Sequence, residues 1–322
     1  MSLLDSRAHY KPLEYPWAFE AYKAMQKMHW LPEEVPLHED VADWQSRLTD
    51  AEKNLLTQLF RFFTQADVDV AGGYRSRYMP AFGGQPEVAM MLWSFGVSEA
   101  NHVDSYSLLL DTIGMPETEY KAFQEYAAMR EKHDYLFGDR HSDLDEKARL
   151  ALDLAIFSAF GEGMQLFSSF AMLLSFPVKR GVMKGMGTIV EWSIKDESHH
   201  VENMVKLFHT FVRENPELWT DDFKGRIYQA ARDMVELEDH FIDLAFEYGG
   251  VDSISKEDVK LYVRYIADRR LNQLGLKSNY GVEENPLPWM EEVLGLRVHT
   301  NFFEARATEY RKGGVDGWDE VF

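Results

Sequence analysis

Two Glu-x-x-His motifs carry the residues best suited to metal chemistry. They are Glu99-Ala-Asn-His102 and Glu197-Ser-His-His200. On a helix, residues three apart share a face, so each motif offers a carboxylate and an imidazole to one ion or to two neighbouring ions. Asp196 and His199 stand at the same spacing, which leaves the second pair open from the residues alone. Roughly one such motif is expected by chance in a chain of this composition, so the neighbouring residues must show whether a motif binds metal.

The surroundings of the acidic residues are apolar. Glu162 stands between the apolar runs 155–160 and 166–167, and Asp67 follows another apolar run at 55–63. Burying an unpaired carboxylate costs several kcal/mol, so buried acids occur mainly where they are paired or hold a metal. We therefore predict a cage for two metal ions, made by Asp67, Glu99, His102, Glu162 and a second acid–histidine pair, which is either Glu197 with His200 or Asp196 with His199.

The donor set of this cage narrows the choice of metal. Di-iron and di-manganese helical bundles use one acidic residue from each of two helices and Glu-x-x-His from each of two others. Oxygen-rich sites with two histidines suit iron or manganese better than zinc or copper. The sequence does not choose between two iron and two manganese ions, because the two metals share these ligands.

Long stretches with helical periodicity position these residues, and glycine and proline occur between them. Thr49 and Glu52 form a plausible capping box at the start of the first stretch. A loop is expected around Gly73, Pro80, Gly83 and Gly84. Strand signals are weak, so we predict one all-α domain. The expected helices span residues 49–70, 86–112, 117–136, 143–176, 177–213, 216–248 and 256–274.

Composition excludes several classes of protein. The net charge of -20 argues against nucleic-acid binding, because phosphates are also negative. The absence of cysteine excludes disulfides, zinc–thiolate sites, iron–sulfur clusters and thiol catalysis, and it fits a cytoplasmic protein. Residues 1–15 lack the apolar core of a signal peptide. Residues 151–176 are long and apolar enough for a membrane span, but Asp153, Glu162 and Gln165 favour a buried helix of a non-membrane protein.

The end of the chain differs from the rest. Residues 301–322 contain Arg311-Lys312-Gly313-Gly314 and finish with Trp318-Asp-Glu-Val-Phe322. This pattern is typical of a flexible tail with an acidic and hydrophobic tip. We expect a single helical domain at 1–300 and a tail at 301–322.

At these motifs the chain resembles the small, radical-generating subunit of class I ribonucleotide reductase, of the tyrosyl-radical type. The resemblance runs from about residue 30 to residue 310, and the combination of motifs is highly specific. The segments that carry it are Trp30-Leu-Pro-Glu-Glu-Val35, Thr64-Gln-Ala-Asp67, Ser98-Glu-Ala-Asn-His-Val-Asp-Ser-Tyr106, Asp196-Glu-Ser-His-His200, Asn285-Pro-Leu-Pro-Trp289 and Asn301-Phe-Phe.

The resemblance implies a ferritin-like helical bundle, with extra helices around a buried dinuclear site. The resemblance implies the ligands Asp67, Glu99, His102, Glu162, Glu197 and His200. It thereby chooses His200 over His199 and leaves Asp196 to support a ligating histidine. The implied cofactor is two iron or two manganese ions with an oxygen-derived bridging oxo or hydroxo ligand. Tyr106 matches the tyrosine that the family oxidises to a stable radical, and its presence argues against the subgroup with phenylalanine there.

The resemblance also implies partners. Trp30, Asp196, His102 and Tyr310 match a radical-transfer route to a large catalytic subunit, which reduces ribonucleoside diphosphates to deoxyribonucleotides for DNA replication. That subunit works with a thioredoxin- or glutaredoxin-type disulfide, and it must supply the thiols that this chain lacks. The tail would dock there through Trp318, Val321 and Phe322. A homodimer is implied, and some relatives need a flavodoxin-like activator.

Three positions depart from common family patterns. The family often surrounds the radical tyrosine with bulky apolar residues, and here Phe170 fits but the other aligned positions are Leu166 and Ser193. Ser193 brings polarity towards Tyr106 and puts the lifetime of a radical in doubt. Lys195 stands where some members have arginine.

Two other functions fit the same ligands. The first is another di-metal oxidase on this fold, such as a ligand-binding oxidase, which needs a lipid-sized cavity and no docking tail. The second is a ferritin-like storage or structural protein, which forms no radical. Activity with a large subunit, deletion of 311–322 and electron paramagnetic resonance separate the three.

Overall fold

The computed structural model describes residues 2–138 and 141–294, and these residues form helices. Over those ranges the only extended pairing is a single β-bridge between Val251 and Ile254. The chain divides into the units Met1–Pro286 and Leu287–Phe322. The expected boundary at 300 and the tail at 301–322 lie outside the described residues, so both stay predictions. The all-α class predicted from the sequence is confirmed.

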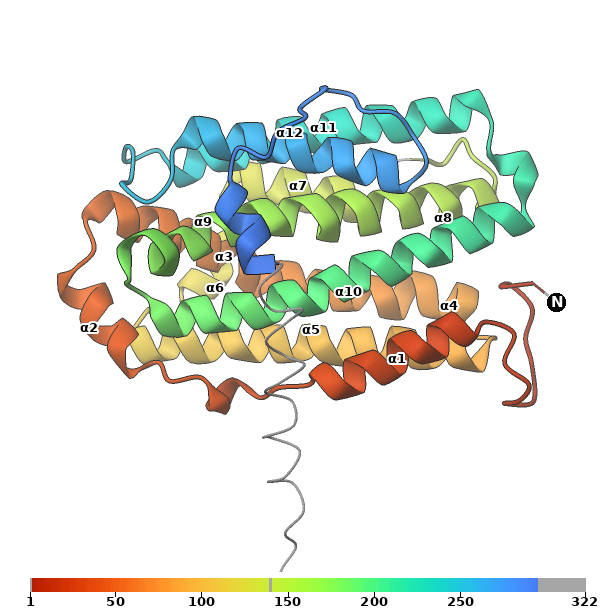
Figure 1. Cartoon of the computed structure of the whole chain (residues 1–322), viewed down its shortest axis with the longest axis horizontal. Helices are drawn as coiled ribbons and strands as arrows, with labels where there is room; N and C mark the ends of the chain where they lie inside the picture. The colour runs from red at the N-terminus through yellow and green to blue at the C-terminus, as the bar shows by residue number, and fades with distance from the viewer. Residues whose placement is uncertain (1, 139–140, 295–322) are drawn as a thin grey trace, which may run out of the picture. The chain divides into compact units, whose positions relative to one another are not determined.

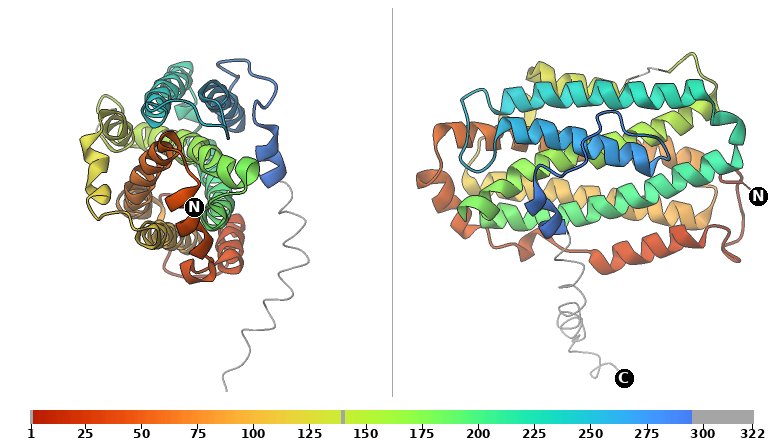
Figure 2. Two further views of the ribbon diagram at one scale, coloured as in Figure 1. Left: turned by 90° about the vertical axis from the view of Figure 1, so that its left-hand side faces the viewer. Right: turned by 45° about the horizontal axis from the view of Figure 1, so that its top comes forward.

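The first unit is a bundle of long helices that run side by side (Figures 1 and 2). Helices α3, α5 and α10 and the continuous path through α8 and α9 enclose the core, while α1, α11 and α12 pack around them. The α-helices are α1 Pro16–Met28, α2 His38–Ser46, α3 Asp50–Gly73, α4 Met79–Phe82, α5 Pro86–Ile113, α6 Glu119–Ala122, α7 Ala127–Phe137, α8 Glu146–Ala155, α9 Phe167–Ser175, α10 Lys184–Glu214, α11 Asp221–Ala245 and α12 Lys256–Gln273.

The start of α3 follows the predicted capping box. Thr49 accepts a hydrogen bond from the backbone N–H of Glu52, and the Glu52 carboxylate accepts one from the backbone N–H of Thr49. The box satisfies two backbone donors that a helix leaves free at its first turn. At the other end of the next long helix, Gly114 takes φ 78°, a left-handed conformation that glycine adopts without strain.

The loop expected at 73–84 is wrong, because most of this segment is helical. Helix α3 continues into a π-helical turn, η2 (Tyr74–Tyr78), and then into α4. Pro80 is the second residue of α4 and directly follows the π-helical turn. Gly73 serves packing and not a turn, since a Cβ there would lie 3.0 Å from the ring of Phe157.

Other helix boundaries differ from the sequence expectation. The helix expected at 143–176 is α8, an 11-residue π-helical segment η4 (Ile156–Leu166), and α9. The helix expected from Pro177 begins at Lys184, because Gly181 and Met183 adopt left-handed φ values of 63° and 55°. The helix expected at 117–136 is interrupted by extended backbone at Tyr126. Helices α1 and α2 lie outside the helical stretches expected from the sequence.

Helix α2 has a structural task at the start of α10. The carboxylate of Asp40 accepts hydrogen bonds from the backbone N–H groups of Gly185 and Met186, at 2.9 and 2.6 Å. Asp43 accepts one from the backbone N–H of Met183 at 2.8 Å. Negative charge at a helix N-terminus satisfies free donors and complements the helix dipole. These contacts therefore fix the end of a helix that carries metal-ligand candidates.

The long apolar stretch is a core element. The helical path Glu146–Arg180 has the length and composition of a membrane span, but 89% of its most apolar window is buried inside the protein. This burial agrees with the prediction that residues 151–176 form an interior helix.

Candidate metal centre

Four helical segments bring the six predicted ligands together. Asp67 comes from α3, Glu162 from η4, and the two Glu-x-x-His pairs come from α5 and α10. All six side chains belong to residues that are at most 2% exposed. The i, i+3 spacing puts each glutamate and its histidine on one face, and the antiparallel packing of the bundle turns these faces inward.

The six side chains form two groups that share Glu99. In one group, ligand atoms of Asp67, Glu99 and His102 all lie within 4.8 Å of one another. In the other, the same limit holds for Glu99, Glu162, Glu197 and His200. Glu99 therefore stands where a carboxylate would bridge two ions.

The contacts inside the cluster are between carboxylate oxygens and histidine nitrogens. His200 Nδ1 lies 2.9 Å from Glu99 Oε1 and 3.5 Å from Glu197 Oε2. His102 Nδ1 lies 3.4 Å from Glu99 Oε2 and 3.3 Å from Glu197 Oε1. Each histidine thus faces the same two carboxylates with its Nδ1 atom, as ligands of adjacent ions would.

The donor atoms of the cluster fit metal ions. Among the described residues, both oxygens of Glu99, both oxygens of Glu197, Oε2 of Glu162 and both ring nitrogens of His200 have no hydrogen-bond partner of proper geometry. So many unsatisfied buried polar atoms in one place are unusual in a folded protein. Cations would satisfy them together and would balance the four carboxylates, so the residues present fit a dinuclear centre.

Without cations, protons balance the charge. Burial and the charge of Glu99 raise the pKa of Asp67 well above its usual value, and burial and Glu197 do the same for Glu162. Burial opposes the charged form of His200, but Glu197 outweighs it and raises the pKa of that histidine to about 10. Metal ions would replace these protons, because ligating carboxylates and imidazoles must be deprotonated.

The structure separates His199 from His200. His200 is fully buried in the cluster, whereas the Nε2 atom of His199 lies 3.0 Å from the backbone oxygen of Ala21 on α1. The two are adjacent on α10, so their side chains point about 100° apart around the helix. His200 is therefore the histidine that faces the carboxylates.

Asp196 lies on the side of His102 away from the other ligands and forms polar contacts with three side chains. Its Oδ2 atom is 3.2 Å from His102 Nε2, and it accepts hydrogen bonds from Trp30 Nε1 at 2.9 Å and from Ser98 Oγ at 3.1 Å. Trp30 also stacks on the ring of His102, with centroids 6.1 Å apart. A carboxylate on the far nitrogen of a ligating histidine fixes its tautomer and orientation. Trp30, Asp196 and His102 thus form a continuous contact chain.

Tyr106 lies next to the cluster in a water-excluded place. It is fully buried, and burial together with the charge of Asp67 raises its pKa well above the usual value. Its ring stacks on that of Phe63, with the ring centroids 4.7 Å apart, and the ring of Phe63 stacks on that of Phe170, with centroids 5.2 Å apart. The Ser193 hydroxyl interacts with that of Tyr106 and acts to lower its pKa, against the larger effect of burial, but among the described residues neither hydroxyl makes a hydrogen bond of proper geometry. Ser193 therefore brings polarity to Tyr106, as the sequence predicts. The aromatic stack, with Phe63 as a member missed from the sequence, supplies the apolar surroundings.

Sequence reasoning also missed Tyr74 and the π-helical segment. The Tyr74 hydroxyl donates to Glu162 Oε1 at 2.5 Å, and Glu162 sits inside η4. π-helical turns are uncommon and often mark functional sites. Tyr74 follows Asp67 by seven residues, which is two helical turns on the same face, and this spacing could have identified it.

Replacing Tyr74 with phenylalanine is expected to weaken metal binding about tenfold, since partners that orient a ligand typically contribute this much. The reason is that Glu162 loses the donor that holds Oε1 in place. Competition with a chelator of known affinity measures the effect. Tyr78→Phe is the matched control, because the equally buried Tyr78 hydroxyl donates to the Asp153 carbonyl. Equal affinities in the two variants would contradict a role for Tyr74.

Several predicted positions cannot be placed at the centre. Tyr310, Trp318, Val321 and Phe322 lie outside the described residues. Lys195 is on α10 beside Asp196, and burial lowers its pKa. Leu166 is buried at the end of η4.

Known proteins resemble this chain over nearly its whole length. The family model for the small chain of ribonucleotide reductase matches residues 7–286. A probable ribonucleoside-diphosphate reductase small subunit of Invertebrate iridescent virus 6 is 43% identical over an alignment 358 positions long, gaps included. The alignment covers 100% of this chain and 99% of the viral one. The ribonucleoside-diphosphate reductase subunit beta of Chlamydia pneumoniae is 30% identical over 318 residues, with 95% and 91% covered.

Solved structures agree on the fold. The ribonucleotide reductase R2 subunit of Clostridium botulinum superposes with a TM-score of 0.81 at 23% identity, covering 89% of this chain and 90% of that one. The dimanganese(II)-NrdF of Streptococcus sanguinis gives 0.74 at 20% identity, covering 86% and 94%. The family resemblance read from the motifs is therefore confirmed, and the chain belongs to the small chains of ribonucleotide reductase.

Proposed function

We propose that the chain holds two iron or two manganese ions with Asp67, Glu99, His102, Glu162, Glu197 and His200, and generates a radical on Tyr106 for a large catalytic subunit. One observation carries the proposal. A buried cluster with unsatisfied ligand atoms on both sides of Glu99 lies beside a tyrosine shielded from water. When bound, the two ions supply a one-electron oxidant.

The chain's own residues decide what is oxidised. The high pKa of Tyr106 keeps its phenol neutral at physiological pH, so loss of an electron requires loss of the hydroxyl proton as well. Asp67 is the carboxylate whose charge acts most strongly on Tyr106, which makes it the proposed acceptor of that proton. The stack with Phe63 and Phe170 excludes water and reductants from the product radical.

The oxidising equivalent then leaves through the contact chain behind the cluster. His102, Asp196 and Trp30 are the proposed members inside this subunit, and Tyr310 is the proposed member at the subunit boundary. Support comes from the contacts of Asp196 Oδ2 with His102 Nε2 and Trp30 Nε1. These contacts connect the cluster continuously to Trp30, which lies just after the end of α1. The large subunit must bind the nucleotide and provide thiols, because this chain has no cysteine.

Trp30→Phe tests the route. Phenylalanine keeps an aromatic ring beside His102 but removes the N–H that donates to Asp196. We expect nucleotide turnover with the large subunit to fall by about two orders of magnitude or more, since each 1.36 kcal/mol added to a barrier costs tenfold. The Tyr106 radical signal should remain.

Trp192→Phe is the control for that experiment. Trp192 also contacts Trp30, with centroids 5.1 Å apart, but it is not among the residues that bond to Asp196. It should keep most of the turnover. Loss of the radical signal in Trp30→Phe would instead assign Trp30 to building the centre.

The partners of the chain are proposed from the family. They are a second copy in a homodimer, the large subunit docked through Trp318, Val321 and Phe322, and a flavodoxin-like activator if manganese is used, all in the cytoplasm. Deleting residues 311–322 is expected to abolish turnover and to leave the metal content and the radical signal intact, since the six proposed ligands and Tyr106 all lie between residues 67 and 200. Turnover that survives this deletion would contradict docking through the tail.

A ligand-binding oxidase is the weaker alternative. It requires a lipid-sized cavity near the ions, and the pocket that borders Glu162 measures about 30 Å³. Ligand pockets for drug-sized molecules begin at roughly 300 Å³. The storage alternative predicts no radical, and the Tyr106 experiment below separates it.

A further inference from the structure

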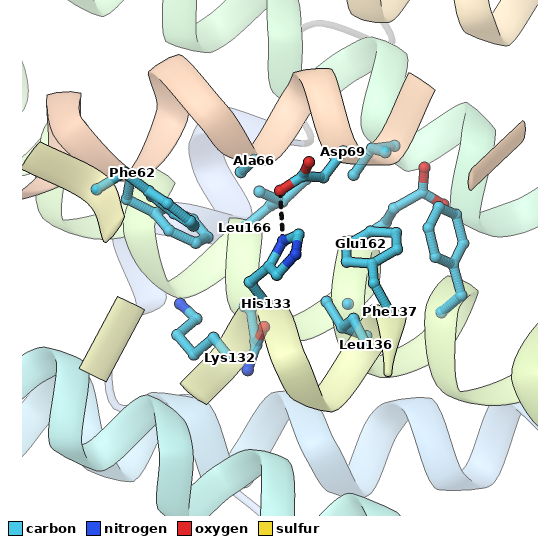
Figure 3. A pocket seen from close by; sticks show the side chains of 14 residues that line it. Phe62, Ala66, Asp69, Lys132, His133, Leu136, Phe137, Glu162 and Leu166 are labelled. Atoms are coloured by element: carbon cyan, nitrogen blue, oxygen red, sulfur yellow. Dashed lines mark hydrogen bonds and ion pairs between the residues drawn. The ribbon is translucent and has the colours of Figure 1, made fainter. Parts of the chain in front are cut away.

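A small pocket lies beside Glu162, between α3, α7 and η4 (Figure 3). Its volume is about 30 Å³, and its wall is almost entirely apolar. Phe62 and Ala66 contribute from α3, Leu136 and Phe137 from α7, and Leu166 from η4. A water-sized molecule needs about 10–15 Å³ by this kind of measure, so the pocket has room for one or two very small molecules.

The lining of the pocket includes both a partly exposed side chain and a proposed ligand of the metal centre. On the outer side, the imidazole of His133 is 36% exposed, and its Nδ1 atom lies 2.6 Å from Asp69 Oδ2. On the inner side, the lining includes Glu162, which is fully buried. A molecule in this pocket is therefore separated from the cluster by a single ligand side chain.

Apart from Glu162, whose Oε2 atom belongs to the proposed metal centre, the charged side chains that line the pocket are paired. The Lys132 ammonium lies 2.6 Å from Glu238 Oε2 and sits over the rings of Phe62 and Phe241, at 3.8 and 4.3 Å. Asp69 contacts His133 and also accepts a hydrogen bond from Gln65. On the side away from Glu162, an apolar wall with paired charges favours an uncharged occupant, because an ion there would lose its hydration without gaining a partner.

The side-chain amide of Gln165 adds a polar group to the pocket lining. Gln165 lines the pocket and is 2% exposed, and among the described residues its Nε2 atom has no hydrogen-bond partner. A buried water needs about two to four polar partners, and this single amide donor does not supply them, so the apolar remainder of the wall favours a small apolar molecule over water. Small apolar cavities stay dry and take up apolar gases.

We propose that this pocket binds dioxygen and is its entry route to the metal centre, with the His133–Asp69 pair at the outer end and Glu162 at the inner end. The inference rests on the proposed function for its reactant. The binding of a small apolar gas in the pocket does not depend on that function and can be tested alone.

Xenon is the probe for gas binding. Crystals of the metal-free full-length chain under xenon pressure should show an anomalous peak among Ala66, Leu136 and Gln165. Leu136→Phe fills the pocket from α7, which carries no proposed ligand, and should abolish the peak. Leu136→Ala enlarges the pocket and should keep or increase it. No xenon in the wild-type pocket, or ordered water in its place, overturns the proposal.

The route is tested by the rate of oxidation. Chains loaded with ferrous iron are mixed with oxygenated buffer, and the second-order rate constant is followed by absorbance. Leu136→Phe should lower it about tenfold, because a close-packed interior offers no equivalent gap. Leu237→Phe on α11, a half-buried leucine outside the pocket lining, should leave it unchanged.

The remaining outcomes are distinct. Xenon lost from Leu136→Phe with an unchanged rate overturns the route. A wild-type rate that changes strongly with salt overturns an uncharged entrant, because screening acts on charged encounters. If the iron-loaded wild type does not react with oxygen while xenon binds as expected, the proposed function fails and the gas site stands.

Discussion

Replacing Tyr106 with phenylalanine is expected to abolish the tyrosyl signal in electron paramagnetic resonance and to reduce nucleotide turnover with the large subunit to background. Phenylalanine has no hydroxyl proton to lose, and oxidation of its ring is far less favourable. The fold should tolerate the change. The Tyr106 hydroxyl makes only a weak interaction with the Ser193 hydroxyl, so the free energy of unfolding should change by about 1 kcal/mol or less.

Two controls test whether the loss of signal is specific to Tyr106. Tyr78→Phe removes another fully buried hydroxyl, one that donates to a backbone carbonyl outside the cluster, and should retain the signal and the turnover. Metal content of Tyr106→Phe should equal that of the wild type, because Tyr106 is not in either ligand group. A wild-type spectrum without a radical under both iron and manganese loading would contradict the proposed mechanism and favour the storage alternative.

Replacing Glu99 with glutamine is expected to remove both ions, because Glu99 belongs to both ligand groups. Elemental analysis after loading and desalting measures this loss. Metal-dependent stabilisation should disappear as well. At a free-metal concentration one hundred times the dissociation constant, each bound ion stabilises a folded protein by about 2.7 kcal/mol, and this increment should be missing in the variant.

Unfolding of the metal-free protein is a separate comparison. The charge of Glu99 raises the pKa of Asp67, but Glu99 Oε1 also lies 2.9 Å from His200 Nδ1 and helps to raise the pKa of that histidine, so glutamine removes an attraction as well as a repulsion. Because the two effects oppose each other, the metal-free variant should unfold near the temperature of metal-free wild type. Glu202→Gln, at an exposed position of α10, is the control and should bind metal normally. Two tightly bound ions in Glu99→Gln would rule out the bridging position.

The parts of this protein that depend on short-range pattern were predictable. Helical spacing places Glu99 with His102 and Glu197 with His200, and the capping box at Thr49 begins α3 as expected. Glu162 was found because an acid in an apolar run requires compensation. Errors occurred where packing overrides local signals. Gly73 was expected in a loop, yet it permits close contact with Phe157 inside a helical path.

By itself, the sequence determined the helical class, the family and the chemical types in the cage, because these depend on composition and on spacings within a helical turn or two. Only the tertiary structure decided which atoms meet. It turns His200 rather than His199 towards the carboxylates, makes Glu99 common to both groups, and brings Trp30 to Asp196 across 166 positions of the chain. It also revealed the bond from Tyr74 to Glu162 and the π-helical segment that carries Glu162. Such contacts depend on how separate helices pack against one another, and the spacing of residues along one helix contains no information about a second helix.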